Sequence, residues 1–392
     1  MDPIRGSSGD PPIVFRRDRL TLLAYGMAAT FGYTIGSFGP AMPLLREDLG
    51  MSRTLGGLHF TALAAGAIVV GFVVDRLVAR WGRRRVFWSG GSFVAIGSLL
   101  VGAGPHPAVT LLGAAMVGGP GTAMLATVQA SLSDRHEFHR AVALTEGNTA
   151  TSFGTVLPAL TIGALVGAGT GWRPAFVAPL LAWILLFGYR RAEPFPPANP
   201  RQPAGAPRHR LPGTYWLFWA AIIPSVGAEW SLGAWGAGYL VDVAGASEGG
   251  ASFLMTSFFG AMVAGRVVGA RLARRARPFG LLLGAAAVGL GGVCLLWAST
   301  RVVPVVAGLL TAGLGISMLF PMLLSLAVDT APERSDTATA RISIAAGSSV
   351  VVAPLLLGAI ADRAGIRTAF GIVPGLFVAV VALAALGRRS PR

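Results

Sequence analysis

The chain has 392 residues, of which 53% are hydrophobic and 12% charged, and it carries a net charge of +15. Soluble domains carry about 25% charged residues, so this composition excludes a water-soluble globule. All 32 basic residues in the lysine-plus-arginine count are arginines, which excludes a lysine-based phosphate-binding loop and a lysine Schiff base. The single cysteine, Cys294, excludes an intrachain disulfide and a thiolate metal cluster.

Twelve long apolar runs follow one another along the chain, each near the roughly 20 residues that a helix needs to cross a bilayer. Lipid requires backbone pairing within helices or closed barrels, and these runs are too long for barrel strands. We therefore predict an all-α membrane protein with twelve transmembrane helices in two repeated six-helix bundles. The predicted spans are 20–44, 54–75, 85–104, 108–132, 141–167, 173–190, 215–240, 250–271, 279–299, 302–327, 341–361 and 368–387.

A proline- and arginine-rich segment separates the sixth run from the seventh and predicts a solvent-exposed cytoplasmic linker at 191–212. The bundles are then expected at 20–190 and 213–387. The remaining residues form cytoplasmic tails at 1–19 and 388–392.

The arginines predict the orientation of the chain. With both termini in the cytoplasm, 25 arginines fall on cytoplasmic segments, 6 fall on the opposite side, and Arg266 lies inside a predicted span. The positive-inside rule therefore favours a multi-pass protein of the cell membrane with both termini cytoplasmic. Because the arginines flank apolar runs, the basic charge needs no nucleic-acid partner.

The two halves of the sequence repeat each other. Gly171 to Phe176 reads GWRPAF at the start of the sixth run, and Gly365 to Phe370 reads GIRTAF at the start of the twelfth. Repeated halves interrupted by glycine and proline are typical of secondary transporters, whose site lies between the two bundles.

The loop between the second and third runs resembles the G-x-x-x-D-R-x-G-[RK]-[RK] signature of the major facilitator superfamily, and the resemblance covers essentially the whole chain. It implies that family's fold, small-solute transport and a gate on the cytoplasmic side. Four extra residues, about one helical turn, separate the two parts of the motif, so the helix is expected to extend. The antiporter signature of the fifth span is degraded, so motifs do not set the direction. The gating candidates are Gly71, Asp75, Arg76, Gly82, Arg83 and Arg84.

Glu229 lies near the middle of the seventh predicted span, where an ionisable residue indicates function. It could carry a coupled proton, pair with a cationic solute, or form a structural pair. Trp230 and Trp235 flank it. Polar residues of the fifth span, Asn148 and Ser152, could line a cavity or hold helices together.

Three further residues complete the candidate set. Tyr33 of the first span is a possible lining residue. For Arg266 a structural or gating pair is favoured over substrate binding, and Glu146 is either gating or interfacial.

These features predict a secondary active transporter that works by alternating access, coupled to protons and exporting a metabolite or drug. Nutrient uptake is the alternative. A channel or receptor is less favoured, because the halves repeat and the polar segments are too short for a signalling domain. No clustered His, Asp or Cys suggests an enzyme, a metal or a cofactor. The expected partners are a small organic solute, protons and the lipid bilayer, and we expect a monomer.

Overall fold

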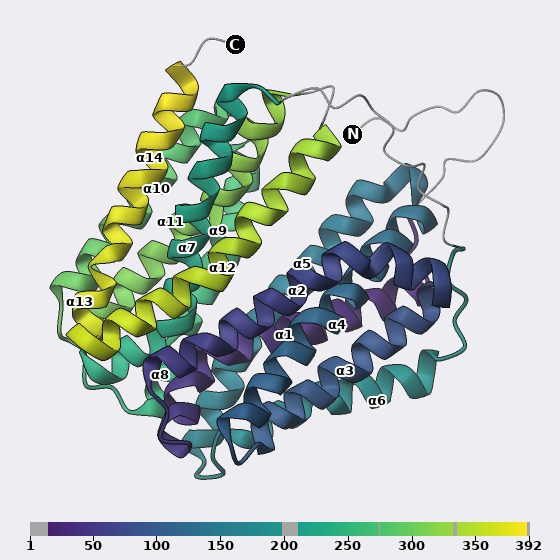
Figure 1. Ribbon diagram of the computed structural model, residues 1–392, viewed down its shortest axis with the longest axis horizontal. Coiled ribbons are helices and arrows are strands. Elements are labelled where there is room, and N and C mark those ends of the chain that lie inside the picture. Colours follow the sequence, from purple (N-terminus) through teal and green to yellow (C-terminus); the bar gives the residue numbers. More distant parts are fainter. Residues whose placement is uncertain (1–14, 198–210, 274, 332–334, 390–392) are drawn as a thin grey trace.

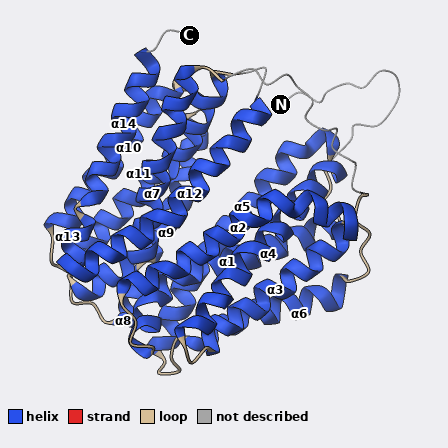
Figure 2. Ribbon diagram, viewed as in Figure 1, coloured by secondary structure: helices blue, strands red, loops and turns tan. Residues whose placement is uncertain are grey.

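The computed structural model describes residues 15–197, 211–273, 275–331 and 335–389. Within these ranges the regular elements are helices (Figure 2). The predicted linker 191–212 and the tails 1–19 and 388–392 lie partly outside the described residues.

The first half of the chain forms the helices of the N-terminal bundle. They are α1 (Arg19–Asp48), α2 (Arg53–Trp81), α3 (Arg83–Ala103), α4 (Pro107–Arg135), α5 (Arg140–Gly167) and α6 (Ala178–Arg190). Short 3₁₀ turns, η1 (Glu137–His139) and η2 (Arg173–Val177), precede α5 and α6. Each of the first six predicted runs therefore corresponds to a helix.

The second half forms the C-terminal bundle, in which two of the predicted runs are divided. Its helices are α7 (Gly213–Asp242), α8 (Glu248–Leu254), α9 (Thr256–Leu272), α10 (Pro278–Ala298), α11 (Val302–Asp329), α12 (Ser335–Ala364), α13 (Ile366–Phe370) and α14 (Ile372–Arg389). The pair α8–α9 covers the eighth predicted run, and α13–α14 covers the twelfth.

Nine helical stretches of the described chain are long and apolar enough to cross a membrane. The shorter α6 and the helices α1 and α7 complete the two bundles by position (Figure 1). The all-helical membrane fold predicted from hydropathy is confirmed.

The two bundles stand side by side and lie closest at one end (Figure 1). Helix α1 begins and α14 ends at the opposite end, where the bundles diverge. We call the end at which α1 begins and α14 ends the terminal face, and the other end, where α2 begins and α12 ends, the distal face.

The backbone preserves the repeat that the sequence indicates. Gly171 and Gly365 both adopt positive φ angles, +77° and +81°, which glycine accepts without steric cost. Each glycine leads into a short helical turn, η2 or α13, ahead of a longer helix. The matching motifs GWRPAF and GIRTAF therefore build the same turn in the two bundles.

Equivalent helices also approach each other through small residues in both halves. A Cβ atom at Gly66 of α2 would lie 2.8 Å from the Gly119 nitrogen of α4. In the second half, Gly265 of α9 packs directly against Ser317 of α11. Small residues permit this close backbone packing in a membrane, where apolar burial between helices contributes little.

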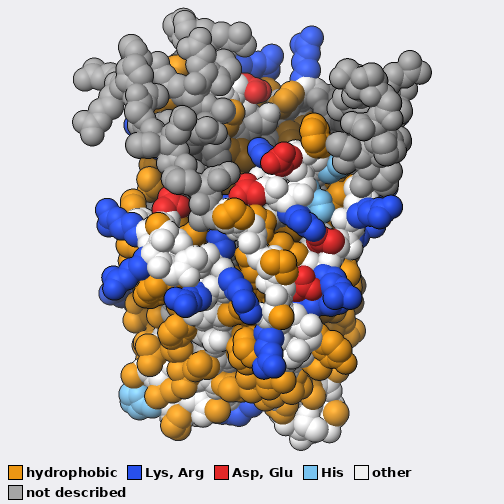
Figure 3. Space-filling model, turned by 90° about the vertical axis from the view of Figure 1, so that its right-hand side faces the viewer, with side chains coloured by type: hydrophobic (Ala, Val, Ile, Leu, Met, Phe, Trp, Pro, Cys, Tyr) orange, Lys and Arg blue, Asp and Glu red, His pale blue; other side chains and the backbone are white. Residues whose placement is uncertain are grey.

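Basic side chains lie mostly away from the distal face on one side of the molecule. On the side of the molecule drawn in Figure 3, most of the arginines lie in a band across the middle of the face, and apolar side chains dominate the lower part, toward the distal face. This distribution agrees with the orientation that the arginine count predicts.

Labelling of engineered cysteines tests the orientation. In a Cys294→Ser background, we expect Arg16→Cys and Arg388→Cys to react with a membrane-impermeant maleimide only after cells are opened. Gly50→Cys and Thr170→Cys, in loops of the distal face, should react in intact cells. Reaction of a terminal position in intact cells would contradict the predicted topology.

Candidate functional site

A cavity of about 180 Å³ lies between the two bundles. Helices α1, α2 and α5 supply one wall, and α7 and α9 supply the other. The lining residues are Ile35, Gly36, Gly39, Phe60, Ser152, Thr155, Val156, Glu229, Trp230, Gly233, Ala234, Phe258, Phe259, Met262, Val263 and Arg266. Because both bundles contribute, any relative movement of the bundles reshapes this cavity.

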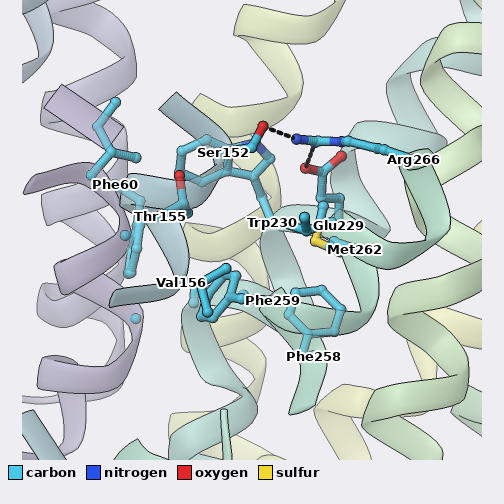
Figure 4. A pocket seen from close by; sticks show the side chains of 16 residues that line it. Phe60, Ser152, Thr155, Val156, Glu229, Trp230, Phe258, Phe259, Met262 and Arg266 are labelled. Carbon is cyan, nitrogen blue, oxygen red and sulfur yellow. Dashed lines mark hydrogen bonds and ion pairs between the residues drawn. The ribbon is translucent and has the colours of Figure 1, made fainter. Parts of the chain in front are cut away.

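The charged centre of the cavity is a chain of three side chains (Figure 4). The Arg266 guanidinium donates a hydrogen bond to the Ser152 hydroxyl at 2.9 Å. A second nitrogen of the same guanidinium lies 3.7 Å from the Glu229 carboxylate, which is an ion pair but too long for a good hydrogen bond. Arg266 and Glu229 belong to the C-terminal bundle and Ser152 to the N-terminal bundle, so Arg266 links the two halves.

The rest of the wall is largely apolar and aromatic. Phe60 of α2 and Trp230 of α7 meet edge to face across the bundle interface, with ring centroids 6.5 Å apart. Phe258, Phe259 and Met262 of α9 complete the apolar side. Such a surface suits the apolar body of a solute, while the charged centre can orient a polar group on it.

The structure brings together some of the candidates predicted from sequence. Glu229, Trp230, Ser152 and Arg266 all line the cavity. Asn148 is exposed, one helical turn from Ser152 toward the terminal face, and does not belong to the lining.

Two aromatic candidates serve packing instead. Tyr33 is buried inside the N-terminal bundle, where its hydroxyl donates a hydrogen bond to the Ala175 carbonyl and contacts Thr161. Trp235 is buried and donates its indole N–H to the Pro354 carbonyl at 2.9 Å. We therefore leave Asn148, Tyr33 and Trp235 out of the proposed site.

Glu146 lies on α5 nearer the terminal face, outside the cavity lining. Its carboxylate forms an ion pair with Arg17 at 2.6 Å and accepts a hydrogen bond from Tyr25. These partners join the start of α1 to α5 within one bundle, which is an interfacial contact rather than a contact between bundles.

The α2–α3 loop shows how the extra residues of the motif are accommodated. Helix α2 continues to Trp81, and Gly82 alone, at φ +78°, separates it from α3. The four extra residues therefore prolong the helix by about one turn, as predicted.

The motif residues divide by location. Arg83 forms an ion pair with Asp134 of α4 at 2.7 Å, and Arg84 donates to the Arg191 carbonyl. Asp75 and Arg76 lie on exposed positions of the last turns of α2. A Cβ atom at Gly71 would meet open space, so this glycine makes no close helix contact in this conformation.

Sequence reasoning missed a contact that joins the bundles at the distal face. Asp362, at the end of α12, accepts hydrogen bonds from the backbone N–H groups of Arg53 and Thr54 at 2.8 and 2.7 Å. These are unpaired donors at the start of α2, where the helix dipole also favours a carboxylate. The Arg53 side chain in turn reaches Asp242 of α7 at 2.5 Å.

Glycines allow the backbones to meet beside this contact. A Cβ atom at Gly57 of α2 would lie 2.8 Å from the Leu355 Cα of α12, and one at Gly358 would lie 2.6 Å from the Arg53 carbonyl. Gly39 of α1 packs against the Gly233 carbonyl of α7 in the same way. The distal side of the cavity is therefore closed by direct contact between the bundles.

Comparison with known proteins identifies the class. The sequence profile of the Major Facilitator Superfamily matches residues 22–236 and 217–392. The chain therefore belongs to this superfamily: it is a multi-pass membrane transporter of small molecules and not an enzyme.

Two relatives carry the same general description. An uncharacterised MFS-type transporter of Yersinia pestis is 23% identical over 369 residues, which cover 93% of this chain and 94% of that protein. An uncharacterised transporter of Sinorhizobium fredii is 32% identical over 153 residues, which cover 38% and 40% of the two chains.

Solved structures share the fold. A bacterial homologue of the human lysosomal transporter Spinster, in an inward-facing and occupied conformation, matches with a TM-score of 0.77 at 15% identity, covering 96% of this chain and 98% of that chain. The nucleoside transporter NupG matches with a TM-score of 0.76 at 13% identity, covering 94% and 100%.

Replacement of Asp362 tests the closure of the distal face. Loss of a helix-capping carboxylate costs about 1 kcal/mol, so Asp362→Ala should shift the population toward a distal-open state by roughly fivefold. Spin labels at Thr170 and Thr300, in distal loops of the two bundles, should then report longer distances by pulsed electron paramagnetic resonance.

Asp362→Asn is the matched control, because it keeps the side-chain size and one acceptor while removing the charge. We expect it to give an intermediate shift. Unchanged distances in Asp362→Ala would show that the capping contact does not hold this face closed.

Proposed function

We propose that this protein is a proton-coupled secondary transporter of the cell membrane that exports a small amphipathic organic solute by alternating access. The solute would occupy the cavity between the bundles, and Glu229 would carry the coupled proton. The observation that carries the proposal is the position of the Glu229–Arg266–Ser152 chain, which lies in the cavity and crosses the bundle interface.

The location of Glu229 supports its role in coupling. Ionisable side chains are costly inside a membrane and are found there mainly on ion or proton pathways. Glu229 is half of a loose pair, with Arg266 3.7 Å away. Protonation of Glu229 would therefore weaken its electrostatic attraction for Arg266. The hydrogen bond from Arg266 to Ser152 in the other bundle would change as a result.

The lining of the cavity supports an amphipathic solute. An amphipathic metabolite or drug favours export, whereas a polar nutrient would favour uptake. The walls of the cavity are mostly aromatic and aliphatic side chains, whereas a sugar-like nutrient would need many hydrogen-bonding partners. The cavity is complete within one chain, which supports function as a monomer. The arginines near the terminal face support an orientation with that face toward the cytoplasm.

Proton flux in proteoliposomes tests the proposal. Wild-type protein should couple outward movement of a substrate to a pH change reported by an entrapped dye. Glu229→Gln should lower the coupled flux to that of empty vesicles, because the amide keeps the shape of the side chain but does not bind or release a proton in the physiological pH range.

Glu146→Gln is the matched control, since Glu146 also lies in a membrane helix but outside the cavity lining. Its pair with Arg17 is exposed, so the control should transport and fold as the wild type does. Full proton-coupled transport by Glu229→Gln would remove Glu229 from the mechanism.

A further inference from the structure

We infer that the transported solute is a small organic anion, namely an aromatic or branched aliphatic monocarboxylate, which binds Arg266 most tightly when Glu229 is protonated. This inference rests on the proposed function, because it takes the cavity as the solute site. It goes further by fixing the sign of the solute charge and the way in which proton and solute bind.

The charge of the cavity decides between an anion and a cation. Among the lining residues, Glu229 and Arg266 are the ionisable ones. The site is therefore neutral when Glu229 is ionised and carries +1 when Glu229 is protonated. It is never negative, so a cation placed against Glu229 would also meet the guanidinium, in surroundings of low dielectric where repulsion is strong.

The guanidinium also has donors to spare. Arginine carries five N–H groups, and the contacts with Ser152 and Glu229 engage two of its nitrogens. The Arg266 side chain remains 45% exposed. Its planar fork matches a carboxylate with two parallel hydrogen bonds, a geometry that an amine or alcohol cannot use.

Proton and anion should bind cooperatively at this site. An ionised Glu229 competes with the solute carboxylate for the same guanidinium, and a protonated Glu229 does not. Helices α1, α2 and α5 add no titratable group to the lining, and the side chain of the N-terminal bundle that contacts the pair is the Ser152 hydroxyl. By linkage, a proton that strengthens anion binding is itself bound more tightly in the presence of the anion.

The size and walls of the cavity define the body of the solute. Its volume of about 180 Å³ lies below the roughly 300–1,000 Å³ typical of drug-sized ligand pockets. Phe60 of one wall and Trp230, Phe258 and Phe259 of the other supply aromatic surface to the cavity, which suits a single ring or a branched chain. A proton and a monocarboxylate would leave together without net charge movement, driven outward when the solute is concentrated inside.

A matched set of three compounds tests the inference on the purified full-length chain. Phenylacetate, its neutral isostere phenylacetamide and the cation 2-phenylethylamine share one ring and differ in charge. Binding is measured by calorimetry and by quenching of tryptophan fluorescence between about pH 5 and pH 8, where phenylacetate stays ionised. We expect phenylacetate to bind more tightly than the other two, and more tightly as the pH falls.

Variants separate the roles of the two charged residues. Arg266→Gln should weaken phenylacetate binding about ten- to a hundredfold, the usual effect of losing a charge-assisted hydrogen bond, and weaken phenylacetamide binding much less, because the neutral amide offers the guanidinium a single uncharged acceptor. Glu229→Gln should bind phenylacetate at every pH and lose the pH dependence. Arg271→Gln, an exposed arginine at the end of the same helix, controls for overall charge.

Each outcome counts for or against the inference. Tighter binding of 2-phenylethylamine, weakening as the pH falls, would overturn the anion assignment and leave proton coupling through Glu229 in place. Absence of phenylacetate binding at millimolar concentration would also overturn it. If Arg266→Gln does not fold, Arg266→Lys, which keeps the charge without the fork, should bind with intermediate affinity, and wild-type affinity in that variant contradicts the inference.

Discussion

The Arg266 side chain joins the two halves of the protein inside the membrane. A guanidinium in this environment must be paired or reach water, and Arg266 finds Glu229 in its own bundle and Ser152 in the other. Around this link the helices supply aromatic walls and small residues, which leave room for a solute. The cavity, the bundle interface and the proposed proton site therefore coincide.

The ends of the bundle interface are built differently from its centre. At the distal face, α2 and α12 meet through Gly57 and Gly358, and Asp362 caps the start of α2. These are backbone contacts, which form only when the helices are in register. Because interfaces of this kind have discrete packed arrangements rather than a continuous range, they suit a protein that switches between two states. The motif residue Asp75 lies near the other end of α2. This helix therefore has a carboxylate at each end: that of Asp362 from α12 at the distal face, and that of its own Asp75 toward the terminal face.

The sequence predicts the architecture well, because hydropathy and the distribution of arginines are set by the bilayer, and the repeated motifs mark the same turn in each half; none of these signals needs details of side-chain packing. The sequence also singles out Glu229, Ser152 and Arg266, because charged and polar residues stand out within apolar runs, and Trp230 as the neighbour of Glu229. The sequence does not show which turns of each helix reach the cavity. Asn148 shares a helix face with Ser152 but lies one turn away from the lining, which no pattern along a single helix can reveal.

The residues that sequence reasoning missed depend on contacts between distant segments. Phe258 and Phe259 are ordinary apolar residues until α9 is placed opposite α5. Asp362 follows a long apolar run and looks like a boundary residue until the start of α2 is found against it, more than 300 positions away in sequence. Trp235 and Tyr33 show the converse, since their polar groups are satisfied by backbone carbonyls within the packed bundles.

A reversible cross-link at the distal face tests most directly whether the two bundles move about the central cavity. In a Cys294→Ser background, Thr54→Cys and Asp362→Cys place thiols at positions whose side chains are in hydrogen-bonding contact at 2.6 Å. A short bifunctional thiol reagent should abolish transport while solute binding from the terminal face persists, and reduction should restore transport. Transport at the uncross-linked rate by the fully cross-linked protein would contradict the account.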